Sequence, residues 1–256
     1  KITYTTDASG NVTITKVEAG DETSIEIPET IDKGTVKIIG ANAFEDCDTF
    51  TSITLPQSLT SIGMLAFHQC TALKSINIPQ NVTNIGDSAF KECKSLTSIS
   101  IPSGVTSINA YTFILCTSLR SIDLPDHLVS IGYGAFVGCS SLESVVIPAD
   151  VTSVGGFAFT GCSSLESVVI PMSVTSVGTK AFDGCTSLKA VFAKEGVPLE
   201  LASVPSDAVK IYYKVEDLGY LSIIKAHTGT QAGIECIEIP KNIGGLDVRA
   251  IKEEAF

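Results

Sequence analysis

Apolar and polar residues alternate over short stretches that recur along most of the chain. In one of them, Leu73, Ile76 and Ile78 are apolar and polar residues lie between them, which is the pattern of a short half-buried strand. A proline follows the stretch, and proline ends a strand because it has no N–H to donate. A second extended stretch, V-T-S-I, precedes a glycine that permits a tight corner. The next letters, A-F-x-x-C, have a spacing that predicts one helical turn with Ala, Phe and Cys facing inward.

Three residue types recur along the chain with one common period, and a period of this length indicates a solenoid. One coil of this size cannot bury its own apolar face, whereas a stack of coils forms a continuous core. Strands in such a stack lie ~4.8 Å apart, so each phenylalanine lies over the next and its burial stabilises the stack by roughly 1.5–3 kcal/mol. The periodic residues are Pro56, Pro79, Pro102, Pro125, Pro148 and Pro171; Phe44, Phe67, Phe90, Phe113, Phe136, Phe159 and Phe182; and Cys47, Cys70, Cys93, Cys116, Cys139, Cys162 and Cys185.

Two of these coils, LTSIGMLAFHQCTALKSINIP at 59–79 and VTNIGDSAFKECKSLTSISIP at 82–102, resemble the BspA-like leucine-rich repeats of bacterial surface proteins. The resemblance implies a β-rich α/β leucine-rich-repeat solenoid, a right-handed curved stack of 23-residue coils with parallel strands and short helical turns. It also implies a secreted or surface-anchored protein, and some family members adhere to host or matrix proteins. Three residues depart from the pattern: Asn109 replaces the corner glycine, Thr112 the alanine before phenylalanine, and Phe50 the first leucine.

The repeat pattern divides the chain into four segments. The first alternates around the turn ASGN and reads as a hairpin, and the third has lost the periodic letters. The predicted segments are 1–23, an N-terminal capping hairpin; 24–193, the repeat array; 194–235, degenerate repeats or a cap between arrays; and 236–256, the truncated start of a second array.

The second array is predicted from one internal alignment. The letters SIEIP-ETIDKGTVKIIGANAF match CIEIP-KNIGGLDVRAIKEEAF with a constant offset. The step from proline to phenylalanine is the same in both places, from Pro28 to Phe44 and from Pro240 to Phe256, and it is longer than in the other coils. No signal peptide opens the sequence. We therefore expect the chain to come from a larger precursor.

Charge and hydropathy narrow the range of partners. The net charge is −11 and the isoelectric point is near 4.7, which argues against nucleic acid and anionic membrane surfaces, since binding to phosphates needs a basic face. No apolar run approaches the roughly 20 residues that span a bilayer, so we expect no membrane insertion. We expect a monomer in an extracellular setting, secreted or at the cell surface.

The recurring cysteines, serines and histidines do not form a recognisable catalytic or metal site. One cysteine per coil gives a line rather than the converging set that a metal requires, so we expect free buried thiols and no disulfide; Cys236 lies outside this line. The recurring strand serines have no partnered base, and His68, His127 and His227 are scattered and predicted at the surface. We expect neither an enzyme nor a cofactor.

One variable position in each coil points to the outside of the first strand. It is polar in the N-terminal coils and apolar in the C-terminal ones, and Met172 lies beside the apolar end. The apolar end is either a binding patch on the concave face or a surface covered by the degenerate segment or the cap. The outward residues are Thr54, Asn77, Ser100, Asp123, Val146, Val169 and Phe192.

The corner loops offer a second candidate surface. Leu65, Tyr111, Tyr133 and Phe157 occupy the two positions after the corner glycine. Such side chains contact proteins or carbohydrates with large area at low entropy cost, although they can equally pack over the neighbouring coil. Two main hypotheses follow: a non-catalytic surface module that binds a host or extracellular protein or glycan, and a structural spacer that projects other domains from the cell.

Overall fold

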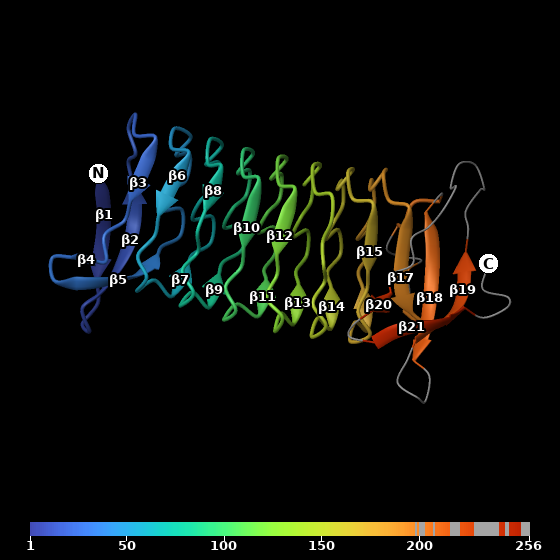
Figure 1. The fold of residues 1–256 in the computed structure, drawn as a ribbon. Helices are drawn as coiled ribbons and strands as arrows, with labels where there is room; N and C mark the ends of the chain where they lie inside the picture. The colour runs from blue at the N-terminus through green and yellow to red at the C-terminus, as the bar shows by residue number, and fades with distance from the viewer. Residues whose placement is uncertain are drawn as a thin grey trace.

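The computed structural model describes residues 1–197, 199, 203–206, 208–215, 221–227, 241–243 and 246–251. Within these residues the chain forms a stack of coils that runs from β1 at one end to β19 at the other (Figure 1). Consecutive coils pair through short parallel strands that join equivalent residues of the repeat, such as Ser98 and Ser121. The predicted leucine-rich-repeat solenoid of 23-residue coils is confirmed.

The first strand row holds the strands that precede the prolines. Their inward residues are buried, except for the half-buried Ile25 of β3, and their flanking residues face outward, as the alternation predicts. Parallel pairing joins β3 to β6 and β8, β10 to β12, and β15 to β17. The row consists of β3 (Ser24–Glu26), β6 (Ser52–Thr54), β8 (Ser75–Ile76), β10 (Ser98–Ser100), β12 (Ser121–Asp123), β15 (Ser167–Val169) and β17 (Ala190–Lys194).

The second strand row precedes the corner glycines. It pairs as β5–β7–β9 and as β11–β13–β14–β16, and it is interrupted between β9 and β11. The row consists of β5 (Gly34–Ile39), β7 (Ser61–Ile62), β9 (Asn84–Ile85), β11 (Ser107–Ile108), β13 (Ser130–Ile131), β14 (Ser153–Val154) and β16 (Ser176–Val177).

Asn109 explains the interruption of the second row. The coils approach so closely at the corners that a Cβ on Gly132 would lie 2.8 Å from the carbonyl oxygen of Ile108. Asn109 carries a Cβ at the corresponding corner, and its side-chain Nδ2 donates to the Ile85 carbonyl at 2.6 Å. The Gly132 backbone N–H makes the equivalent bond, to Ile108, at 2.7 Å. The asparagine thus keeps the carbonyl satisfied but replaces a backbone contact with a side-chain contact.

The predicted helical turns are wrong: the described chain contains no helix, and the A-F-x-x-C segments are runs of tight turns. In residues 63–70, Leu65 and Gln69 have φ values of 56° and 58°, in the left-handed region that a right-handed helix excludes. Alternate N–H groups leave the turn and donate to the next coil, for example from Phe67 to Ala89 at 2.8 Å. Hydrogen bonds between coils therefore take the place of helical ones. The predicted burial of Ala66, Phe67 and Cys70 is confirmed.

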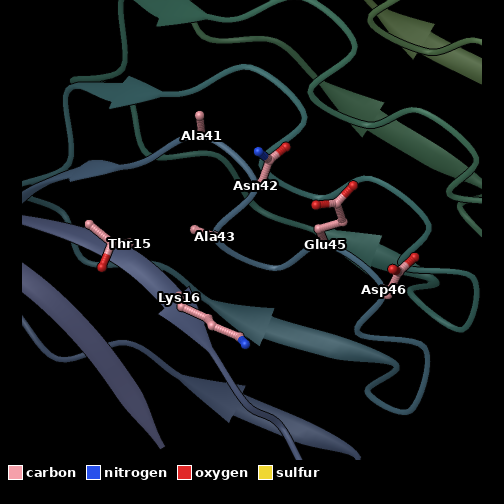
Figure 2. A pocket seen from close by; sticks show the side chains of 7 residues that line it. All are labelled: Thr15, Lys16, Ala41, Asn42, Ala43, Glu45 and Asp46. Atoms are coloured by element: carbon pink, nitrogen blue, oxygen red, sulfur yellow. The ribbon is translucent and has the colours of Figure 1, made fainter.

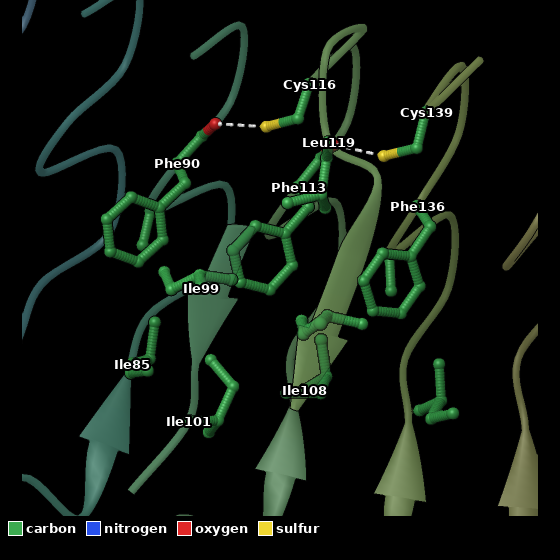
Figure 3. Packing of buried hydrophobic residues seen from close by; sticks show 14 of the residues in the cluster. Ile85, Phe90, Ile99, Ile101, Ile108, Phe113, Cys116, Leu119, Phe136 and Cys139 are labelled. Atoms are coloured by element: carbon green, nitrogen blue, oxygen red, sulfur yellow. Dashed lines mark hydrogen bonds between the residues drawn. The ribbon is translucent and has the colours of Figure 1, made fainter. Parts of the chain in front are cut away.

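The core is a ladder of phenylalanines flanked by a ladder of thiols (Figure 3). Phe90 and Phe113 stack with ring centroids 5.5 Å apart and an interplanar angle of 3°. The Cys116 thiol donates to the Phe90 carbonyl at 3.1 Å, and burial raises the pKa of this thiol well above its ordinary value. All seven cysteines from Cys47 to Cys185 are free and buried; Cys236 lies outside the described residues. The thiols therefore serve as small buried groups that link neighbouring coils.

Both ends of the stack carry antiparallel strands. At the N-terminus, β1 pairs with β2 and β4 pairs with β5 in antiparallel fashion, while β2 and β5 pair in parallel. At the C-terminus, β18 joins β17 in parallel, and the sheet continues in the order β18–β19–β21–β20. Residues 228–240 and 252–256, which include part of the predicted second array, lie outside the described residues. The strands are β1 (Ile2–Thr6), β2 (Asn11–Val17), β4 (Thr30–Ile31), β18 (Val209–Val215), β19 (Leu221–His227), β20 (Asn242–Ile243) and β21 (Leu246–Ile251).

Candidate functional site

The outward positions of the first strand row differ sharply in exposure. Thr54, Asn77, Ser100 and Asp123 are exposed, and Val146 is 82% exposed. Among the described residues, no serine of these strands is bonded to a histidine; the half-buried Ser52 Oγ donates to Ser24 Oγ at 3.2 Å. The N-terminal part of this column is thus a polar solvated face.

The apolar end of the column is covered. Phe192 is only 1% exposed, and Val169 and Met172 are half-buried. These side chains pack in a second hydrophobic cluster with residues of β18 and β19 and with Val248 of β21. In Figure 1, β21 crosses the lower ends of the strands beside β17 and β18. Phe192 therefore offers no surface to a partner. Of the two alternatives for this position, coverage by another segment is the one observed.

Val146 remains exposed beyond this cover, and the coils around it carry exposed ion pairs. Arg120 Nη1 lies 3.4 Å from Glu143 Oε1, and Lys189 Nζ lies 3.2 Å from Glu166 Oε2, with all four side chains mostly exposed. The neighbouring outward residue towards the N-terminus is Asp123. Its neighbour towards the C-terminus, Val169, is half-buried and packs in the second cluster, so Val146 is a single exposed valine and does not form an apolar patch.

The corner loops bring their aromatic residues together in a row that we call the corner strip: Tyr111, Tyr133 and Phe157. The Tyr111 and Tyr133 ring centroids are 5.4 Å apart with the planes at 73°, and those of Tyr133 and Phe157 are 5.3 Å apart at 50°. Tyr111 and Tyr133 remain 37% and 47% exposed, and Phe157 is half-buried. Leu65, two coils away, is half-buried and separate from the strip.

A glycine lies beside each tyrosine ring of the corner strip, and one of them, Gly134, makes room for its ring. A Cβ on Gly134 would lie 2.6 Å from the Tyr111 ring, so this coil has space for the ring only because it carries glycine there. Gly156 lies against the Tyr133 ring in the next coil, where a Cβ would be at 3.4 Å. Lys180 Nζ lies 5.8 Å from the Phe157 ring centroid and ends the row with a cation–π contact. The sequence signal was available: each tyrosine is followed by a glycine at the equivalent position of the next coil.

Other exposed apolar side chains gather on the same turns. Met64 is 51% exposed and Leu115 is 38% exposed, and both lie in the corner turns, although the sequence pattern did not mark these two residues. Of the six large hydrophobic residues exposed in the described chain, only Val129 and Val146 lie elsewhere. Exposed apolar area is therefore concentrated along the corner turns.

His68 is not the surface residue that the sequence predicts. Its side chain is 13% exposed, with Nδ1 3.0 Å from Glu45 Oε1 and Nε2 3.8 Å from Glu92 Oε1. Its two nitrogens face carboxylates of different coils, so the three groups bridge coils rather than converge on a metal position. His127 is exposed and lies 3.1 Å from Asp150 Oδ2, and the His227 side chain lies outside the described residues.

A hollow of about 460 Å³ lies between β2 and the first corner turn. Figure 2 shows Lys16 on one side and Glu45 and Asp46 on the other. Lys16 already lies 3.9 Å from Glu18 Oε1, and both side chains are mostly exposed. The hollow is open and its charged groups are solvated, so it lacks the convergent buried polar groups of a ligand site.

Throughout the described ranges, no group of three or more His, Cys, Asp or Glu side chains is placed to hold a metal ion. The same ranges hold no helix with the length and apolar character needed to cross a bilayer.

Comparison with known proteins places the chain among bacterial repeat proteins. The family model of the BspA type leucine rich repeat region matches residues 21–139 and 106–209. A solved leucine rich cell surface protein from Faecalibacterium prausnitzii A2-165 is 32% identical with a TM-score of 0.70, covering 96% of this chain and 63% of its own. The leucine rich repeat protein of T. pallidum is 29% identical with a TM-score of 0.53, covering 74% of this chain and 78% of its own.

The chain therefore spans less than two thirds of the Faecalibacterium protein. The comparison with curated proteins gave no match.

Proposed function

This chain belongs to the BspA type leucine-rich repeat family, and we propose that it is a non-catalytic cell-surface binding module for a host or extracellular protein. Two features support the proposal: the similarity to a leucine rich cell surface protein and the exposed corner strip. The same similarity supports an extracellular or cell-surface location.

The corner strip carries the proposal because it combines exposed aromatic area with rigid support. The Tyr111 N–H donates to the Tyr133 carbonyl at 2.9 Å, so backbone hydrogen bonds between coils hold the strip. Tyrosine supplies large contact area at a low cost in side-chain entropy, and its hydroxyl can bond a partner at the edge of the contact. A rigid row of such residues is preorganised for binding.

The ring geometry favours a protein over a glycan. Successive rings meet at 73° and 50°, so the strip presents ring edges and hydroxyls rather than one flat platform for sugar faces. Leu115 and Met64 add exposed aliphatic area on the neighbouring turns. Mixed aromatic and aliphatic contacts of this kind are typical of protein interfaces.

The double variant Tyr111→Ser, Tyr133→Ser tests the corner strip. Both side chains are exposed, so the fold should persist, while binding to an immobilised extracellular-matrix extract should fall at least about tenfold, since truncating an aromatic anchor commonly costs about 2 kcal/mol. The matched control, Val129→Ser, Val146→Ser, removes two other exposed apolar residues and should bind as the wild type does. Equal binding by the two variants would contradict the assignment. Loss of wild-type binding after enzymatic removal of the matrix glycans would identify a glycan instead.

A structural spacer is the second candidate, and the regular stack favours it. The phenylalanine ladder continues from Phe44 to Phe182 with neighbouring rings 4.8–5.7 Å apart, which makes a continuous rod. A spacer requires no ligand, so wild-type chain that fails to bind both matrix extract and cell monolayers would support it.

A further inference from the structure

The two ends of the described chain contain the same four-strand module. The first copy is β1, β2, β4 and β5, and the second is β18, β19, β20 and β21. In the first hairpin Tyr4 pairs with Ile14, and in the second Tyr213 pairs with Ile223 at the same sequence separation. The hairpin partners of the short strands also correspond: Thr30↔Thr35 and Ile31↔Gly34 in the first copy match Asn242↔Asp247 and Ile243↔Leu246 in the second.

Even the irregularities of the two copies coincide. The register shifts between Thr3 and Tyr4 in the β1–β2 pair, and it shifts between Tyr212 and Tyr213 in the β18–β19 pair. The parallel pairs β2–β5 and β19–β21 also shift at one equivalent step, after Val12 and after Leu221. Bulges are specific local features, so their coincidence identifies one module in two places.

The copies differ at the outer edge of their first strand. In the second copy, β18 pairs in parallel with β17, the last strand of the array, so that Ile211 lies beside Phe192. In the first copy, β1 is the terminal strand of its sheet, and within the described residues its outer edge has no partner. An unpaired edge of this length presents free N–H and C=O groups to another strand.

The side chains of β18 and β1 differ in burial in the same way as their edges differ in pairing. Ile211 and Tyr213 are fully buried against the outward face of the array, and the Tyr213 hydroxyl donates to the Ile170 carbonyl at 2.7 Å. Their counterparts Ile2 and Tyr4 are only half-buried. The Tyr4 hydroxyl is bonded to the exposed Asp32 carboxylate instead. The first copy thus has apolar residues at the positions that are covered in the second.

We propose that the outer edge of β1 is the docking site for the last strand of a repeat array joined to the N-terminal side of Lys1. The bound strand would run parallel to β1 and carry apolar outward residues, as Phe192 and Val169 do in the strands before β18. The module would therefore connect two arrays. Its first strand, β1, pairs with the last strand of the preceding array, and its last strand, β5, begins the second strand row of the following array.

A second copy of this chain cannot dock on this edge through the last strand of its own array. The strand that would have to dock is β17, and β17 is already paired on both sides, with β15 and with β18. A coil attached ahead of Lys1 has its last strand available. It also enters in the order seen in the second copy, where the coil of β17 directly precedes the module in the chain.

The test adds residues 163–209 ahead of Lys1 of the full chain, so that Val209 precedes Lys1 as it precedes Lys210. Amide exchange of residues 2–6, measured by mass spectrometry, should slow at least about tenfold relative to the unextended chain. The matched control carries Phe192→Asp in the added segment only, which places a charge opposite Ile2, and it should leave β1 exchanging as fast as in the unextended chain.

Three outcomes would overturn the proposal. Equal exchange of β1 in the two extended chains would show that the outward apolar residue does not direct docking. An added segment that stays unprotected beside a protected array would show that β1 does not accept a coil. Concentration-dependent protection of β1 in the unextended chain, with a dimer by light scattering, would assign the edge to a second copy.

Discussion

The first and second copies of the terminal module contain corresponding strands in different surroundings. Ile211 of the second copy is fully buried because β17 and its outward residues lie against it, whereas Ile2 of the first copy is half-buried at an unpaired edge. The comparison shows that burial of this position depends on the neighbouring coil rather than on the module. It also explains why the outward column becomes apolar: Val169 and Phe192 are the surface on which the second copy packs.

Truncating the two equivalent isoleucines should give the largest difference between the copies. Ile211→Ala removes a fully buried side chain and should cost about 2 to 5 kcal/mol, whereas Ile2→Ala should cost about 1 kcal/mol because solvent already reaches that side chain. The free energy of opening, from amide exchange of β18 and β1, measures each loss.

Amide exchange in the coils of the phenylalanine ladder serves as the internal reference for both variants, since neither Ile2 nor Ile211 belongs to the ladder. Similar losses in the two variants would mean that the two environments are energetically equivalent, against the difference in burial.

Removing the two equivalent hydroxyls should give a smaller difference. Tyr213→Phe leaves the buried Ile170 carbonyl without its donor, which should cost about 1 to 3 kcal/mol. Tyr4→Phe removes a solvent-exposed bond to Asp32, and only a minor change is expected. Denaturant unfolding followed by circular dichroism compares the variants, and a Tyr4→Phe loss as large as that of Tyr213→Phe would reverse the order of the two environments.

Raising the pH into the alkaline range should also distinguish the buried Tyr213 from Tyr4, and this is the smallest of the expected effects on stability. Burial raises the pKa of Tyr213 well above its ordinary value, so the folded state holds a proton that the unfolded state releases above pH about 10. The contribution of the Tyr213 hydroxyl to the free energy of unfolding is therefore fully present below that pH and declines as the pH rises towards the pKa of the folded state. Ultraviolet titration of the tyrosines should show a late component that Tyr213→Phe removes and Tyr4→Phe leaves in place. Loss of this component in Tyr4→Phe alone would contradict the assignment.

Much of the repeat could be predicted because every coil must bury the same residue types at equivalent positions. The spacing of Phe67, Phe90 and Phe113 requires a common position in successive coils, and the structure stacks these rings. The corner turns could not be predicted in the same way. The A-F-x-x-C spacing fits a helical turn and a run of tight turns equally well, and hydrogen bonds to the next coil decide between them.

The candidate surfaces were predicted only in part. The sequence places Tyr111, Tyr133 and Phe157 in related loop positions, but their ring contacts form only in the folded stack, where Gly134 leaves room beside the Tyr111 ring. It also marks Phe192 as outward-facing, yet it does not show which segment packs on it. Contacts between segments that are distant in the sequence decide how exposed a side chain is, and a local sequence pattern does not predict such contacts.

The amino-acid pattern was enough to establish the coil length, the inward phenylalanines and cysteines, and the family. These features follow from a repeated pattern of burial, which one period imposes on every coil. The folded chain was needed to establish that the hairpin of β18 and β19 repeats that of β1 and β2, and that these strands cover the apolar end of the array. The letters of the two hairpins have diverged, whereas their strand pairing and bulges are set by backbone geometry, which different side chains can share.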